Sequence, residues 1–177
     1  MYKEVRSIMS PKSLCRRVRA AVISLAVVGS IVCFYLIPGF GENIARANPE
    51  FAYCFWPWLI FLWLTAAPCY AILALAWRVS TAIGNEQVFT AQTARWVAVA
   101  ARLLFADAGF FFAGNLLLAL AVVFFPLPND THMSHPAVLV ISLLICIIAV
   151  SLASIAMVLS RYIAKAAALE EEVLGTI

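Results

Sequence analysis

The sequence predicts an all-α membrane protein with four transmembrane helices in an up-down-up-down bundle. The first observation is composition, because 65% of the 177 residues are hydrophobic and only 12% are charged. A water-soluble fold has too little interior for so much apolar surface, and the mean hydropathy of +0.99 is typical of chains solvated by lipid. The second observation is that the apolar residues form four long runs, and the third is an asymmetric distribution of Lys and Arg.

Each run is long enough to cross a hydrocarbon core of about 30 Å, which takes roughly 20 helical residues. A transmembrane β-barrel instead has segments of about 10 residues that alternate apolar and polar, and the chain shows no such alternation. Short links make neighbouring helices antiparallel, in a single domain over residues 1–177. The spans are expected at about residues 20–37, 57–77, 103–125 and 137–160.

Eleven of the 12 Lys and Arg residues fall on one side of this topology, and Arg46 alone falls on the other. Basic residues concentrate in cytoplasmic segments, so both termini are expected in the cytoplasm. The first run is longer than a typical signal-peptide core and is expected to remain an uncleaved helix. The net charge of +3 then indicates topology and contact of the basic N-terminal segment with anionic lipid, and no direct nucleic-acid binding.

Several local signals place the ends of these helices. Pro38-Gly39 predicts a turn after the first span, and Pro68 predicts a kink in the second, where the Thr65 hydroxyl is expected to help satisfy the freed carbonyl of Leu64. Gly84-Asn85 predicts a helix stop. Thr90 predicts the N-cap of a helix that runs from Ala91 to Phe125 and extends into the cytoplasm.

The fourth span is also expected to continue past Arg161 into the cytoplasm. Glutamates at positions 170–172 oppose the helix macrodipole there, so this tail is expected to fray in solution, the alternative being that a basic partner holds it.

The sequence lacks the motifs of common enzyme classes. It contains no Gly-rich phosphate loop, HExxH, GxSxG or CxxC, so a protein without enzymatic activity and without a cofactor is expected. One outer loop holds a carboxylate and two imidazoles, residue types that bind divalent metal. Three polar residues are ordinary in a short exposed loop, and no metal site is predicted from Asp130, His132 and His135.

Asp107 stands inside the third apolar run, where a carboxylate costs about 2.5–3.5 kcal/mol at a helix centre and less toward an interface. Arg102 is expected at the inner membrane boundary, which puts Asp107 about 7.5 Å deeper along the helix axis. Ala100, Gly114 and Ala121 share its helix face. Small residues let a second helix approach, so Asp107 is expected to face the protein and not lipid.

The leading interpretation of Asp107 is a structural ion pair or hydrogen bond that holds the helices together, and the second is proton or ion coupling. Arg102 lies on another face of the helix, which it shares with Ala106 and Gly109, and is a poor partner. Asn115 lies deeper and about 80° round the helix, so it need not share a site with Asp107. The candidate partners of Asp107 on other spans are Arg78, Arg161, Arg19 and Tyr162.

The stretch GNEQVFTAQTARWVAVAARL, residues 84–103, resembles a segment of small bacterial four-span membrane proteins of unknown function. The C-terminal EEEVLGTI is similar to their common ending of acidic residues before Leu-Thr-Ile, although Gly175 stands where that ending has leucine. Members of the family are often encoded beside a Cro-like helix-turn-helix regulator. The resemblance therefore implies a location in the bacterial cytoplasmic membrane and a cytoplasmic regulator as partner.

The leading functional hypothesis is a non-enzymatic sensor or anchor that engages a cytoplasmic protein through residues 79–90, residues 91–102 and the acidic tail. The alternative is a small transporter or channel subunit, assembled as a homo-oligomer, that uses Asp107. Transporters usually have broken helices or internal repeats, and a single carboxylate is weaker evidence than those features.

Overall fold

The computed structural model describes residues 11–47, 49–85, 87–124 and 135–175, and every regular element within them is helical. Four helices are long and apolar enough to cross a membrane, as predicted: Lys12–Ala47, Phe55–Gly84, Ala91–Leu117 and Leu139–Glu170. In chain order the elements are α2 (Pro11–Ile31), the π-helix η1 (Val32–Leu36), α3 (Ile37–Ala47), the 3₁₀-helix η2 (Pro49–Cys54), α4 (Phe55–Gly84), α5 (Ala91–Phe124) and α6 (His135–Gly175).

The first span does not end at Pro38-Gly39, and the expected turn there is wrong. The helix continues through both residues to Ala47, because one π-turn precedes the proline. Proline has no N–H and its ring clashes with the carbonyl four residues back. In η1 the N–H of Ile37 instead bonds the carbonyl of Val32, five residues back, and this wider turn accommodates Pro38 without a break.

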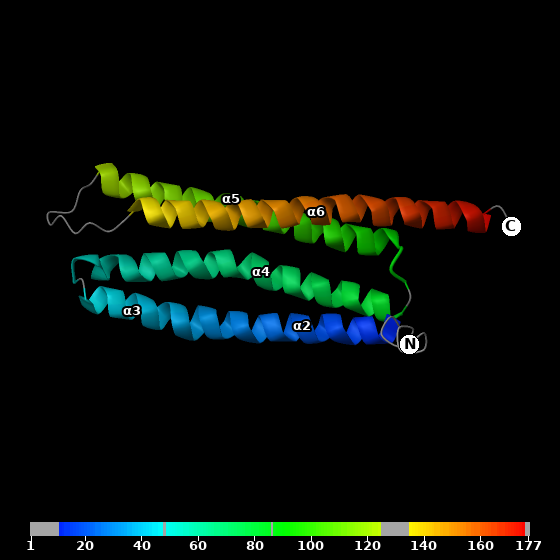
Figure 1. The fold of residues 1–177 in the computed structure, drawn as a ribbon, viewed down its shortest axis with the longest axis horizontal. Helices are drawn as coiled ribbons and strands as arrows, with labels where there is room; N and C mark the ends of the chain where they lie inside the picture. The colour runs from blue at the N-terminus through cyan, green and yellow to red at the C-terminus, as the bar shows by residue number, and fades with distance from the viewer. Residues whose placement is uncertain (1–10, 48, 86, 125–134, 176–177) are drawn as a thin grey trace, which may run out of the picture.

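Helix α4 contains Pro68 and changes direction along its length (Figure 1). The Thr65 hydroxyl donates to the carbonyl of Leu62 at 2.8 Å, so the expectation that it serves Leu64 is wrong. A threonine hydroxyl reaches carbonyls three or four residues back along its own helix, which excludes the residue next to it. The predicted stop is confirmed, since α4 ends at Gly84.

The N-cap predicted for the third span is confirmed. The backbone N–H of Thr93 donates to the Thr90 hydroxyl oxygen at 3.2 Å, and α5 begins at Ala91. The N–H of Ala94 bonds the Thr90 carbonyl at 3.1 Å, which closes the first helical turn. Thr90 therefore satisfies donors that α5 otherwise leaves open at its start.

We expect Thr90→Ala to lower the free energy of unfolding by about 1 kcal/mol, because the backbone N–H of Thr93 loses the hydroxyl oxygen that caps the helix. The measurement is unfolding of the purified protein in mixed detergent micelles, followed by far-UV circular dichroism. Thr90→Ser retains the hydroxyl and is the matched control, which should stay close to the unsubstituted protein. Equal losses in both variants would show that the cap bond is not what stabilises this end of α5.

The long helices form a row in the order α2, α4, α5, α6, each antiparallel to the next (Figure 1). Over the described residues, no Cα atom of α2 comes within 8 Å of α5 or α6, and none of α4 within 8 Å of α6. The predicted up-down alternation is present, but the described part of the chain forms a row and not a closed bundle. Among the four long helices described, α4 packs between α2 and α5, and α5 packs between α4 and α6.

Small residues spaced by seven form the contact between α5 and α6, which we call the α5–α6 seam. Ala101 is 1% exposed and Ala153 is 0% exposed, and the Cys146 thiol donates to the Ala108 carbonyl at 3.3 Å. A repeat of seven keeps one stripe of each helix on its partner, and small side chains let the backbones approach. The buried members are Ala94, Ala101 and Ala108 on α5 with Cys146, Ala153, Ser160 and Ala167 on α6.

Both extended helices are present, as predicted. Helix α6 has 41 residues, and at 1.5 Å per residue it is about 60 Å long, twice the hydrocarbon thickness. It stays helical through all three glutamates to Gly175, so the expected fraying does not occur. Ala167, about two turns before the end of α6, is buried, so α6 is packed against the described chain up to this level.

The start of α2, the link between α4 and α5 and the end of α6 lie at one end of the row (Figure 1). We call it the basic end, since nearly all of the described Lys and Arg residues belong to it. They are Lys12, Arg16, Arg17, Arg19, Arg78, Arg95, Arg102, Arg161 and Lys165, whereas Arg46 lies at the end of α3 and pairs with Glu42.

Candidate functional site

Asp107 lies on the face of α5 that packs against α4. One heptad along the same face, a Cβ atom on Gly114 would lie 2.2 Å from the Phe61 ring of α4, so the two helices are in close contact there. The Cys69 thiol of α4 donates to Asp107 Oδ2 at 3.6 Å. The expectation that Asp107 faces the protein therefore agrees with the geometry, and its neighbour is a thiol.

The second carboxylate oxygen, Asp107 Oδ1, is shielded from solvent and has no hydrogen-bond partner within the described residues. Buried polar atoms nearly always have a partner, so an unsatisfied carboxylate oxygen inside an apolar helix pair is unusual. Such residues in membrane segments are expensive to bury and are frequently functional. Asp107 is thus the principal candidate for an intramembrane functional group.

The structure pairs Asp107 with none of its expected partners in the described part of the chain. Cys69 lies level with it, whereas Arg78 is about 13 Å further along α4 at 1.5 Å per residue. The thiol of Cys146 on α6 bonds the carbonyl of Ala108, and Arg161 is about 22 Å beyond Cys146 by the same spacing. The register of the helices thus keeps Arg78, Arg161 and Tyr162 near the basic end, and Arg19 bonds α4 there.

We expect Asp107→Asn to leave the free energy of unfolding unchanged or to raise it. The amide keeps an oxygen that accepts from Cys69, and it removes a buried charge that has no cation beside it among the described residues. Unfolding in mixed detergent micelles measures the difference. Asp107→Leu, which also removes the acceptor, is the comparison that isolates the Cys69 bond. A loss of more than about 1 kcal/mol in Asp107→Asn would reveal an ion pair and restore the original expectation.

Two other predicted intramembrane polar residues lie apart from Asp107. The Asn115 amide donates to the carbonyl of Phe111 at 2.8 Å, a bond within α5 that satisfies it locally. Arg102 is exposed, and a Cβ atom on Gly109 of the same helix face would meet nothing within 4 Å. That face is open, so Arg102, Asn115 and Asp107 do not form one site.

The outer-loop metal candidates are not part of any described cluster. Asp130 and His132 lie outside the described residues, and His135 begins α6 with its side chain likewise outside them. Over the rest of the described chain, no three His, Cys, Asp or Glu side chains come together as a metal site would require.

A second polar cluster, not anticipated from the sequence, joins α2 to α4 near the basic end. The Ser80 hydroxyl is fully buried and donates to the Cys15 carbonyl at 3.1 Å. Gly84 lies beside the same cysteine, since a Cβ atom there would be 3.0 Å from the Cys15 sulfur. Small residues on α4 therefore let α2 approach closely at this level.

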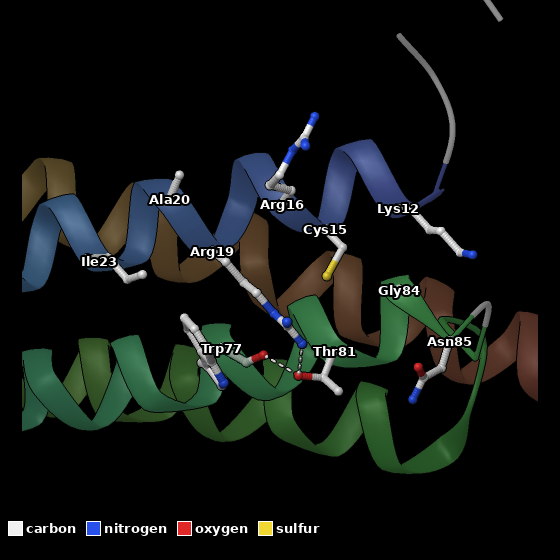
Figure 2. Close-up of a pocket in the computed structure, with 10 residues that line it drawn as sticks. All are labelled: Lys12, Cys15, Arg16, Arg19, Ala20, Ile23, Trp77, Thr81, Gly84 and Asn85. Carbon is white, nitrogen blue, oxygen red and sulfur yellow. Dashed lines mark hydrogen bonds between the residues drawn. The ribbon is translucent and has the colours of Figure 1, made fainter. Parts of the chain in front are cut away.

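Arg19 is the central charge of this cluster. Its Nη2 donates to the Thr81 hydroxyl at 3.1 Å, and that hydroxyl donates in turn to the Trp77 carbonyl at 3.1 Å (Figure 2). The guanidinium carbon lies 5.0 Å from the centroid of the Trp77 ring, within the range of a cation–π contact. Trp77 and Thr81 are one helical turn apart, a spacing that is visible in the sequence, but only the register of α2 against α4 shows that Arg19 meets them.

Further polar contacts continue along the same helix pair. The hydroxyls of Ser30 and Tyr70 lie 2.9 Å apart, and the Trp63 indole N–H donates to the Cys33 carbonyl at 3.1 Å. Hydrogen bonds between helices stabilise their association in lipid by about 0.6 kcal/mol each on average. The cluster and the Ser30–Tyr70 contact join α2 to α4, and the Trp63–Cys33 bond joins η1 to α4.

The outer surface of the row is apolar over most of its length. Large side chains such as Leu25, Phe34 and Ile155 are 60–65% exposed. In the most apolar stretch of each of the four long helices, at most 17% of the residues are buried. Four long apolar helices with outward-facing hydrophobic side chains define a multi-pass membrane protein.

Residues 39–177 match the family model described as "Protein of unknown function (DUF2975)", and the chain belongs to this family. No curated protein and no solved structure matches it. The match begins within α3, so it includes α4, α5, α6, Asp107 and the α4 side of the polar cluster, and leaves out α2.

Proposed function

We propose that this protein is a non-enzymatic sensor or anchor of the bacterial cytoplasmic membrane that engages a cytoplasmic protein through its basic end. The single observation that carries the proposal is the paired extension of α5 and α6. Both helices exceed the length that a bilayer requires, and Ala94 and Ala167 remain buried in the extension. A helix pair that is longer than the bilayer requires presents a defined surface to a soluble partner.

The proposed orientation places the basic end in the cytoplasm, because Lys and Arg are retained on that side of bacterial membranes. The N-terminal basic segment is then positioned to contact anionic lipid. A reporter fused after residue 177 tests this: green fluorescent protein should fluoresce and alkaline phosphatase should be inactive. The opposite pair of results would place the basic end outside and contradict the proposal.

The proposed partner is a small helix-turn-helix regulator, as the family resemblance implies. The test is a pull-down from detergent extract with the full chain and with a chain lacking residues 161–177. The full chain should recover the regulator and the truncated chain should not. Arg95→Glu and Lys165→Glu reverse exposed charges on the extension and should lower the recovery of the regulator. Arg46→Glu reverses an exposed charge on α3 and is the matched control, which should leave the recovery unchanged. Recovery of no cytosolic protein by the full chain would overturn the proposed function.

A transporter or channel subunit is the second candidate, and the unsatisfied Asp107 Oδ1 is the observation that favours it. In this proposal the open face of α5, which carries Gly109, meets another copy of the chain. Reconstituted vesicles loaded with a pH-sensitive dye measure proton flux in the unsubstituted protein and in Asp107→Asn. Flux that is equal in two equally folded proteins would exclude this function.

A further inference from the structure

A groove of about 570 Å³ lies between the first turns of α2 and the last turns of α4 (Figure 2). It is open to the surroundings at the basic end. Its α2 wall carries Lys12, Arg16 and Arg19, three cations within two helical turns. None of the described residues that line the groove is acidic, so its positive charge is not neutralised by the part of the chain seen here.

Arg19 reaches from α2 across the groove to α4 (Figure 2), and its contacts hold the guanidinium in place. The Nη2–Thr81 bond uses one of its five N–H groups. A guanidinium that is already oriented and still has free donors suits an anion with several acceptor oxygens, such as a phosphate.

The deeper part of the groove is apolar. Ile23 follows Arg19 along α2 on the side toward α4, and the Trp77 ring lies on the α4 side of the groove (Figure 2). The cations therefore lie toward the end of the helices and the apolar residues toward the membrane interior. A ligand that fits both parts carries a phosphate on an apolar chain, which is the structure of a phospholipid and not of a free phosphate.

We propose that the groove between α2 and α4 is a binding site for an anionic phospholipid, with the phosphate at Arg19 and Lys12 and an acyl chain along Ile23 and Trp77. The inference rests on the proposed orientation and deepens the lipid contact of the N-terminal segment. That contact is a diffuse attraction that any basic residue provides, whereas the groove binds one lipid through Arg19. The bound lipid would also bridge α2 and α4, which adds to the polar contacts between them.

The test uses the full chain purified in a neutral detergent and titrated with phosphatidylglycerol, with bound lipids counted by native mass spectrometry. One lipid should bind with clear preference over diacylglycerol, which has no phosphate. We expect Arg19→Gln to weaken this binding about tenfold, because a hydrogen-bonded charge is lost. Arg17→Gln removes an exposed charge from the same helix outside the groove and should weaken it less than about twofold.

Equal effects of Arg19→Gln and Arg17→Gln would overturn the proposal that the groove binds lipid and would leave only diffuse attraction. That result would not test the proposed cytoplasmic partner. If Arg19→Gln fails to fold, Lys12→Gln decides, because Lys12 lines the groove and does not bond α4 in the described structure. Weaker binding in Lys12→Gln than in Arg17→Gln supports the site, and equal binding overturns it. Displacement of the lipid by inorganic phosphate at equal concentration would identify a soluble anion as the ligand and overturn the lipid proposal.

Discussion

Ala101→Phe is expected to separate α5 from α6 and to lower the free energy of unfolding by about 3 kcal/mol, the upper part of the usual range for an overfilled contact. Ala101 is 1% exposed, and it lies in the α5–α6 seam one heptad from Ala94 and from Ala108. The backbones approach at this level because the side chains are small, so a phenyl ring has no space unless the helices move apart. Unfolding in mixed detergent micelles gives the magnitude.

The matched control is Ala106→Phe on the open face of the same helix. Ala106 is exposed, and Gly109 beside it has free space around it, so a ring there extends into lipid. We expect less than about 0.5 kcal/mol of change, as for most surface substitutions. If Ala106→Phe is as destabilising as Ala101→Phe, the open face is covered in the assembled protein, and the homo-oligomer becomes the favoured arrangement.

Gly114→Ala is expected to be the second large effect, with a net loss of about 1–2 kcal/mol. Its Cβ atom would lie 2.2 Å from Phe61 Cε2 and 2.4 Å from Phe61 Cζ, far inside van der Waals contact. The Phe61 ring is not free to turn away, because it stacks on Phe111 and contacts Phe110. The overfilling cost therefore exceeds the gain of up to about 1 kcal/mol that alanine provides over glycine in a helix.

Gly109→Ala is the matched control for this prediction. Among the described residues nothing lies within 4 Å of a Cβ atom built at Gly109, so only the helix-propensity contribution remains. Stability should be unchanged or higher by up to about 1 kcal/mol. A Gly114→Ala protein that unfolds at the same denaturant concentration as Gly109→Ala would show that α4 and α5 are not in close contact at Phe61.

Gly114 packs against α4 and Gly109 lies on an open face, and helix periodicity predicts only the first of these two environments. Gly114 was expected on the face of Asp107, and that face does meet another helix. Gly109 belongs to a second stripe of small residues with Ala106, which is open in the described structure. Periodicity shows which residues share a face, but small residues on two faces are compatible with several neighbours.

For Asp107, too, the sequence predicts some properties and only the packing of the helices decides others. Its face and its depth follow from the spacing of residues along one helix. Its neighbour depends on the register between α4 and α5, which brings Cys69 and not Arg78 to its level. An ion pair with arginine was the natural expectation from charge, yet no contact within α5 specifies how far α4 is shifted along it.

The sequence by itself determined the properties that depend on short stretches of chain: four apolar helices, the cap at Thr90, the stop at Gly84 and the start of α5 at Ala91. These follow from local hydrogen bonding and from the transfer of apolar residues to lipid, so neighbouring residues suffice to predict them. The tertiary structure alone decided that the helices form a row, that Arg19 meets Thr81 and Trp77, and that Asp107 Oδ1 lacks a partner among the described residues. Helices in lipid are apolar on most faces, so hydrophobicity does not determine which helices pack together. Close packing of small and polar residues in one register determines it.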